Sequence, residues 1–365
     1  MTNGENVREA FLIQEHYCAA MDAPIYARIC AVLARGLTPD SAVGARVLGW
    51  TGEPTRDAVP LRLIGGLHAL VIAGQDDELA TVFAGKVREA ATIVGVLERV
   101  LARHEAALMP WLDGPPQTNE PGRSAALMTG LLEVARTCGP RIEILEIGSS
   151  AGLNLLIDRY RFDLGGTVVG PVDSPVRLKP DWSGAAPAPV EIEIVATRGC
   201  DVATMAATDP AVEARLAAYV WAETPERLAR LRAAIGMLRE RGVALDRADA
   251  ADWLEARLAE PQAAGVTRVL MHSVVWQYLP EPVAERIRVA MAAAGAWATA
   301  ERPLGWVAME PDRSLAQQVV RVRSWPGDGA WQVLATAHAH AAWVKYGVPE
   351  AGAGIALPAG AKITV

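Results

Sequence analysis

Apolar positions along the chain follow two different spacings. Up to about residue 138 they recur at helical intervals, which predicts helices over 7–21, 25–35, 60–73 and 92–108. From Arg141 onward, short apolar runs rich in β-branched residues alternate with further helical stretches. We therefore expect a helical N-terminal domain, 1–115, followed by an α/β domain, 116–365, with an irregular insertion at about 161–189.

The first of these runs, 142–147, predicts a strand buried on both faces. Gly148 and Gly152 then bracket three small residues, and leucines follow at helical spacing. Such a strand–loop–helix unit presents free backbone N–H groups and the positive end of a helix dipole to a ligand. Glu146 ends the strand, and its carboxylate is costly to bury without a partner, so we expect it to bond loop N–H groups or a ligand.

The order of the later elements is βα repeated four times, then a strand, then an antiparallel hairpin. Strands are expected over 191–196, near 244, and over 266–275 and 304–309. Apolar and polar residues alternate within 319–344 on both sides of a Pro-Gly-Asp-Gly turn, which predicts the hairpin. The stretch 311–318 is barely long enough for a last crossover helix; without one, the terminal strands form a meander and His338 and His340 change ends of the sheet.

Composition narrows the possible partners. Half of the 365 residues are apolar and the net charge is −7, so no basic field favours nucleic acid or an anionic membrane. No apolar run is long enough to cross a bilayer, and the first residues lack a signal-peptide pattern. Four scattered cysteines without a C-x-x-C pair fit neither a zinc site nor a disulfide framework, so we expect a cytoplasmic protein without a metal.

The glycine loop matches two different functional motifs. Glu-x-Gly-x-x-x-Gly resembles the first motif of class I S-adenosylmethionine (SAM) methyltransferases, with Ser150 in place of the middle glycine. The same residues read Gly-x-Ser-x-Gly, the nucleophile elbow of α/β-hydrolases, with Ser150 as nucleophile. His272, His338 or His340 could activate that serine, but the helical region upstream of Arg141 lacks the strands that precede a hydrolase elbow. A serine hydrolase therefore remains only the alternative.

The order from 141 to about 344 is similar to the class I methyltransferase layout, a Rossmann-like sheet with a closing hairpin. The resemblance implies that SAM is the cofactor and that its contacts fall on the following residues: Glu146, Gly148, Ser150, Gly152, Asn154, Asp201, Asp249 and Ala250. Asp201 would hold the ribose, with Asp158, Asp163 and Asp173 as alternatives, and Asp249 would accept from the adenine amine.

Roles in methyl transfer to a small molecule follow from position along the strands. His272, at the end of a strand, is the first candidate for a general base. The alternative is that His272 is a structural histidine that bonds a backbone carbonyl. Tyr278 joins it as a catalytic candidate, while Trp276 and Gln277 would shape the acceptor pocket, unless Trp276 belongs to the core. His338 and His340 share a face of a strand, yet a third ligand for a metal is missing nearby in sequence.

A polar, proline-rich stretch, 110–123, precedes a capped helix that leads into the central strand. If that helix packs antiparallel to the strand, Asn119, Glu120 and Arg123 converge on the pocket of Gly148 and His272. The alternative is an inter-domain linker, whose side chains would point to solvent.

Longer stretches, PQTNEPGRSAALMTGLL, LEIGSSAGLNLLIDRYRFD, HSVVWQYLP and AHAHAAWV, resemble an uncharacterised bacterial domain-of-unknown-function family. That resemblance implies a methyltransferase-like fold with a helical extension and supplies no reaction, so a non-catalytic nucleotide-binding protein also remains open. The sequence leaves the oligomeric state undetermined.

Overall fold

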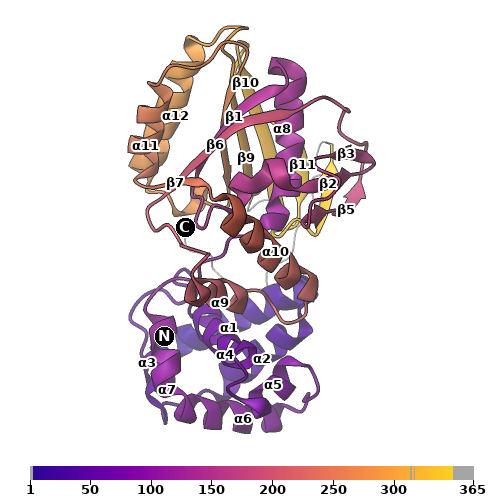
Figure 1. Cartoon of the computed structure of the whole chain (residues 1–365). Helices are drawn as coiled ribbons and strands as arrows, with labels where there is room; N and C mark the ends of the chain where they lie inside the picture. Colours follow the sequence, from indigo (N-terminus) through magenta and orange to yellow (C-terminus); the bar gives the residue numbers. More distant parts are fainter. Residues whose placement is uncertain (1–2, 313–314, 316, 348–365) are drawn as a thin grey trace. The chain divides into compact units, whose positions relative to one another are not determined.

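The computed structural model describes residues 3–312, 315 and 317–347 (Figure 1). Contacts within the chain divide these residues into two compact units. A helical unit contains residues 3–118 together with 210–228, and an α/β unit contains 119–209 and the described residues from 229 onward. The division falls three residues after the boundary expected from the sequence, and a segment between two strands of the α/β unit belongs to the helical unit.

The helical unit is built from short helices with identifiable start signals. Asp76 caps α5 by accepting the Leu79 N–H at 2.9 Å, and Ser41 caps α3 by accepting the Gly44 N–H at 3.0 Å. The helices are α1 (Asn3–Ala20), α2 (Pro24–Gly36), α3 (Ala42–Leu48), α4 (Val59–Ile72), α5 (Asp77–Phe83), α6 (Ala90–Arg103), α7 (Glu105–Leu108), the 3₁₀ turn η1 (Met109–Leu112) and α9 (Pro210–Ala218).

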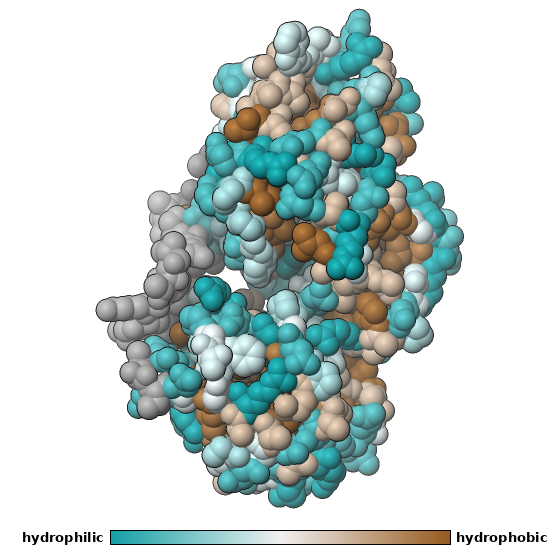
Figure 2. All heavy atoms as spheres, turned by 90° about the vertical axis from the view of Figure 1, so that its left-hand side faces the viewer, coloured by the Kyte–Doolittle hydropathy of each residue, from teal (hydrophilic) through white to brown (hydrophobic). Residues whose placement is uncertain are grey.

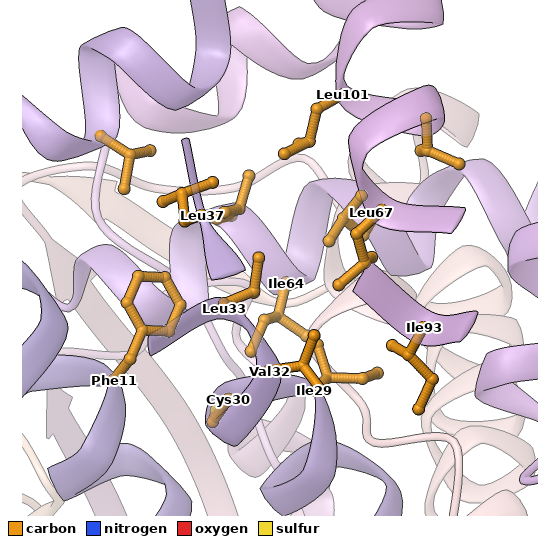
Figure 3. Close-up of a cluster of buried hydrophobic side chains, with 14 of the residues drawn as sticks. Phe11, Ile29, Cys30, Val32, Leu33, Leu37, Ile64, Leu67, Ile93 and Leu101 are labelled. Atoms are coloured by element: carbon orange, nitrogen blue, oxygen red, sulfur yellow. The ribbon is translucent and has the colours of Figure 1, made fainter. Parts of the chain in front are cut away.

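Side chains from α1, α2, α4 and α6 form the core of this unit (Figure 3). Phe11, Ile29 and Ile64 are completely buried at its centre. Within α4, His68 is also buried; its Nδ1 donates to the Ala218 carbonyl at 3.1 Å and lies 2.9 Å from the Tyr26 hydroxyl oxygen. Burial lowers the pKa of His68 to about 4, so it is a structural, neutral side chain.

The α/β unit contains a nine-stranded, mostly parallel sheet in the order β5-β12-β11-β10-β9-β8-β1-β6-β7. The five strands from β9 to β7 in that order are mutually parallel, and the meander β9 to β12 is antiparallel. Their bounds are β1 (Arg141–Ile147), β5 (Asp181–Ser183), β6 (Glu193–Asp201), β7 (Ala244–Arg247), β8 (Thr267–Ser273), β9 (Leu304–Asp312), β10 (Gln317–Trp325), β11 (Gln332–Ala337) and β12 (Trp343–Tyr346). The expected mixed α/β class and the hairpin β10–β11 are confirmed.

Helices cover both faces of this sheet (Figure 1). α8 (Ser124–Cys138) packs on β9, β10 and β11, and Gly130 permits this because an added Cβ would lie 2.4 Å from the Val307 side chain. α11 (Ala250–Leu258) and α12 (Glu281–Ala296) pack against each other on the other face. α10 (Pro225–Arg241) precedes β7.

The connection from β1 to β6 departs from the expected βαβ unit. After the glycine loop the chain forms a 3₁₀ helix, η3 (Leu153–Arg159), in place of a longer α-helix. A three-stranded sheet then follows, made of β2 (Arg161–Leu164), β3 (Thr167–Val169) and β4 (Arg177–Leu178) in the order β3-β2-β4. The insertion expected at 161–189 is therefore this small sheet together with β5, which joins the edge of the large sheet beside β12.

The terminal strands form a meander. β9 pairs directly with β10, with Asp312 opposite Gln317, so the last crossover helix has no room. β11 therefore runs in the direction of β9 and ends at the carboxyl edge of the parallel strands. His338 and His340, which follow β11, lie at that edge.

The face drawn in Figure 2 intersperses hydrophilic and hydrophobic residues. Over the ranges that the structure describes, each helix is too short or too polar to cross a lipid bilayer.

Candidate functional site

The loop after β1 needs glycine at both of its ends. Gly148 and Gly152 have φ angles of 68° and 75°, in the left-handed region that favours glycine. A Cβ added at Gly148 would lie 2.3 Å from Val275 Cγ2, and one at Gly152 would lie 2.8 Å from Val243 Cγ2. These two glycines therefore allow the loops after β1 and β8, and the segment before β7, to approach one another closely.

Several N–H groups of this loop are used within the protein. Four of them donate to protein acceptors: Ser149 to the Cys200 carbonyl, Ser150 to Asp201 Oδ2, Gly152 to the Ser149 carbonyl and Leu153 to Asn119 Oδ1. The helix that follows is a seven-residue 3₁₀ segment, which has little macrodipole. The expectation of free donors is therefore wrong for these four N–H groups, which the side chains of Asp201 and Asn119 and two backbone carbonyls accept.

Glu146 is the most unusual group at this edge of the sheet. Its side chain is 2% exposed, and this burial raises its pKa to about 7, with hydrogen bonds from Ser149 and Asn154 opposing the rise and the nearby Asp201 charge adding to it. Its Oε2 atom is buried and has no hydrogen-bond partner in the described part of the chain. A buried carboxylate oxygen without a protein partner marks a position where a ligand donor would be favourable.

A buried polar network connects Glu146 with the start of α8. Ser124, the first residue of α8, is fully buried and donates to Asn154 Oδ1 at 2.8 Å. The amide nitrogen of Asn154 is thereby directed to the Glu146 carboxyl group. Asn154, expected as a cofactor contact, acts here as a bridge between α8 and Glu146.

The stretch 119–123 packs into the α/β unit. Asn119 and Glu120 are 8% and 4% exposed, and Glu120 Oε1 accepts from the Gly122 N–H at 2.8 Å and from Arg230 at 3.2 Å. Arg123 Nε donates to the Ala339 carbonyl at 3.0 Å. These side chains lie beside the Gly148 loop and the turn after β11, so they do not form a solvated linker. Asn119 and Glu120 hold backbone and side-chain groups in place.

The acids expected after β6 and β7 lie at the carboxyl ends of those strands. Asp201 accepts from the Ser150 and Ala203 N–H groups at 2.9 and 2.8 Å, so it ties the loop after β6 to the glycine loop. Asp249 caps α11, accepting from the Ala251 N–H at 2.9 Å, and Ala250 is buried in the first turn of that helix.

The alternative ribose acids are placed differently. Asp158 pairs with Arg241 at 2.7 Å, Asp163 pairs with Lys179 at 2.9 Å, and Asp173 is exposed in the insertion. Of the four acids weighed for this role, only Asp201 hydrogen-bonds to the glycine loop in the described residues.

His272 does not offer a free lone pair. The Trp306 indole N–H, which can only donate, bonds to Nε2 at 2.9 Å. Nδ1 must then carry the proton, and it donates to Glu310 Oε1 at 2.6 Å. The ring is 2% exposed. The interpretation of His272 as a general base is therefore corrected: both ring nitrogens are engaged, and the histidine positions Glu310.

Glu310 in turn organises the loop after β8. Its carboxylate accepts the N–H groups of Val275 at 3.1 Å and Trp276 at 3.3 Å. Trp276 stacks on His272 with ring centroids 5.2 Å apart and packs against the core. It therefore fits the alternative of a core residue better than that of a residue lining the acceptor pocket. Gln277 and Tyr278 are exposed, and Tyr278 has 73% of its surface accessible. Those two side chains are available to an acceptor.

Glu310 was not among the residues predicted from the sequence. The sequence does place an acid directly after the expected strand 304–309, and in the structure this strand, β9, pairs in parallel with β8, which carries His272. Trp306 and Arg230 were missed as partners because their contacts with His272 and Glu120 join positions 34 and 110 residues apart.

Ser150 lacks the environment of a nucleophile. Its φ of 54° is unusual for a residue with a side chain and resembles that of an elbow. However, its hydroxyl contacts Met205 Sδ at 3.5 Å, and the nitrogens of His272 are occupied as described. A triad requires a histidine that accepts the serine proton. The described residues provide none next to Ser150.

His338 and His340 lie in the turn after β11, with ring centroids 5.2 Å apart. The His340 N–H donates to His338 Nδ1 at 3.2 Å, which occupies one possible metal-binding nitrogen. Within the described ranges no group of three or more His, Cys, Asp or Glu side chains is arranged to hold a metal ion.

Comparison with known proteins places the chain in one family. Residues 8–346 match the family described as an uncharacterized protein conserved in bacteria, DUF2332, so the chain belongs to that family. No curated protein matches the chain. No solved structure matches it either.

Proposed function

We propose that this member of the DUF2332 family binds S-adenosylmethionine at the carboxyl edge of its sheet and transfers the methyl group to a small molecule. The order of the parallel strands supports the location. From β1 the chain proceeds to β6 and β7 on one side, then returns to β8 and β9 on the other. In open α/β sheets, ligands bind outside the carboxyl ends of the strands where the order reverses, which here lies between β1 and β8.

Electrostatics favour a cationic ligand at this position. Glu146, Asp201 and Asp249 follow or end three strands that are consecutive in the sheet, at its carboxyl edge. Four of the loop N–H groups that could attract a phosphate already have protein acceptors. SAM carries a sulfonium and an ammonium group, so it complements carboxylates better than a dinucleotide with its pyrophosphate does. The buried, unpartnered Glu146 Oε2 is the observation that carries the proposal.

Particular residues have particular parts in this proposal. Glu146 would accept from a donor of the cofactor, while Asp201 and Asp249 would face its ribose and adenine. When bound, SAM supplies a methyl group activated by the sulfonium, so the chain needs mainly to orient the acceptor and exclude water. Tyr278 and Gln277 would contact the acceptor. His272 would act through Glu310, which fixes the loop that carries them.

Isothermal titration calorimetry of the full chain with SAM, its demethylated product and NAD tests this proposal. We expect binding of the first two and none of NAD. Gly148→Ala should weaken SAM binding at least tenfold, because its Cβ would collide with Val275. Gly242→Ala is the matched control: Gly242 also has a positive φ, 69°, but its Cβ would have open space. Absence of SAM binding at millimolar concentration would refute the cofactor.

A further inference from the structure

The helical unit contains a cavity of about 270 Å³ that is separate from the candidate site. It is lined by the C-terminal end of α2, the segment 38–41 and one face of α6. Leu33, Leu37 and Leu101 contribute to its walls, and Figure 3 shows their side chains among the core cluster. The cavity opens to solvent, since Asp40, a lining residue, is exposed.

The size and the walls of the cavity suit an apolar ring or short chain. A cavity of about 150 Å³ lined by aliphatic side chains already accepts benzene. Leu33, Leu97 and Leu101 are at most 4% exposed and supply such walls here. The remaining volume leaves room for a short arm that extends from a ring to the opening.

The polar lining of the opening is acidic. Asp40 and Glu98 are both exposed lining residues, and neither forms an ion pair in the described part of the chain. The hydroxyl oxygen of Ser41, another lining residue, accepts the Gly44 N–H at 3.0 Å. A group that emerges from the apolar interior therefore meets two carboxylates.

The nearby arginines are engaged elsewhere. Arg35 lies 3.9 Å from Glu15, and Arg99 pairs with Glu78. Arg8 donates to the carbonyls of Ala34 and Leu37, both at 2.7 Å, and does not line the cavity. The lining itself contains no Lys, Arg or His side chain, so its formal charge is negative.

We propose that this cavity binds a small organic cation, an apolar body that carries one ammonium group. The body fills the space between α2 and α6, and the ammonium lies at the opening between Asp40 and Glu98. This inference does not depend on the function proposed for the α/β unit, because it concerns a different set of residues.

Three ligands of the same shape and different charge test the proposal: benzylamine, benzyl alcohol and benzoate. Binding to the full chain is followed by ¹H–¹⁵N spectra and calorimetry at pH 7. We expect shifts in residues 33–41 and 94–102, and binding of benzylamine about tenfold tighter than benzyl alcohol, with benzoate weakest. Equal affinities, tighter binding of benzoate or no binding of benzylamine at millimolar concentration would overturn it.

Two sets of variants locate the site. The double variant Asp40→Asn with Glu98→Gln should remove the preference for benzylamine while benzyl alcohol binds as before. Ala102→Trp, at an exposed lining position, should abolish binding of both, and Ala106→Trp, at an exposed position outside the lining, should not. Retained binding in a folded Ala102→Trp variant would place the ligand elsewhere and contradict the proposal.

Discussion

The indole N–H of Trp306 donates to Nε2 of His272 at 2.9 Å, and this one bond fixes the tautomer of the histidine. Nδ1 is left to donate to Glu310, whose carboxylate also accepts two N–H groups of the loop after β8. His272 is thus the buried end of a chain of hydrogen bonds that shapes the loop.

We predict that Trp306→Phe destabilises the protein by about 1–3 kcal/mol, because it leaves a buried nitrogen without its donor. Urea unfolding measures the change. Trp331→Phe is the matched control. Trp331 is 41% exposed, and its ring centroid is 5.0 Å from that of Trp306. Equal losses in the two variants would mean that packing, not the hydrogen bond, is responsible. Long-range ¹H–¹⁵N spectra of the wild type should show His272 protonated at Nδ1 at pH 7.

The raised pKa of Glu146 predicts a pH-dependent stability. Its pKa rises from 4.5 when unfolded to about 7 when folded. Between these values the unfolded state loses the proton first, so the free energy of unfolding falls as pH rises from 4.5 to 7 and this loss is complete above 7. The penalty above pH 7 is on the order of 2–4 kcal/mol.

Glu146→Gln removes this ionisation. The variant should be more stable than the wild type at pH 8 and closely similar to it near pH 4.5, as measured by urea unfolding at both values. Glu240→Gln, at an exposed position of α10, should show no such difference. A Glu146→Gln variant that loses stability at pH 8 would show that the carboxylate is already paired in the protein.

Ser150 is predicted not to be a nucleophile, because its hydroxyl contacts Met205 and not an imidazole. A fluorophosphonate probe should leave it unlabelled, and Ser150→Ala should change SAM affinity by no more than a few-fold. Stoichiometric labelling at Ser150, mapped by peptide mass spectrometry, would restore the hydrolase alternative.

Asn119→Ala should cost about 1–3 kcal/mol of stability, because the Leu153 N–H would lose its acceptor in a buried position. Thermal and urea unfolding measure the effect. Thr118→Ala, one residue earlier and exposed, should be neutral within about 0.5 kcal/mol. If both variants were neutral, the linker alternative for this stretch would describe it better.

Local patterns were sufficient to predict much of the fold. The β-branched run that ends in Glu146 and the two glycines after it define β1 and its loop, because each depends on neighbouring residues only. The helical spacing over residues 7–108 likewise predicts the first helices of the helical unit. The alternation on both sides of the Pro-Gly-Asp-Gly turn predicts β10 and β11.

Long-range partners could not be read from the sequence. Asn119 and Asp201 take N–H groups of the glycine loop that local reasoning assigned to a ligand. The Trp306 indole N–H donates to His272 Nε2, so the lone pair that a general base would need is already engaged. The leucines after Gly152 fit an α-helix by spacing, yet they form a 3₁₀ segment. The contacts of Asn119, Asp201 and Trp306 each join separate elements of the fold.

A crystal structure of the protein grown with saturating SAM would show directly whether and where the cofactor binds. We predict ligand density at the carboxyl ends of β1, β6 and β7, with a donor of the ligand within hydrogen-bonding distance of Glu146 Oε2. Density at another place, or a ligand that leaves Glu146 Oε2 without a partner, would contradict the proposed binding site.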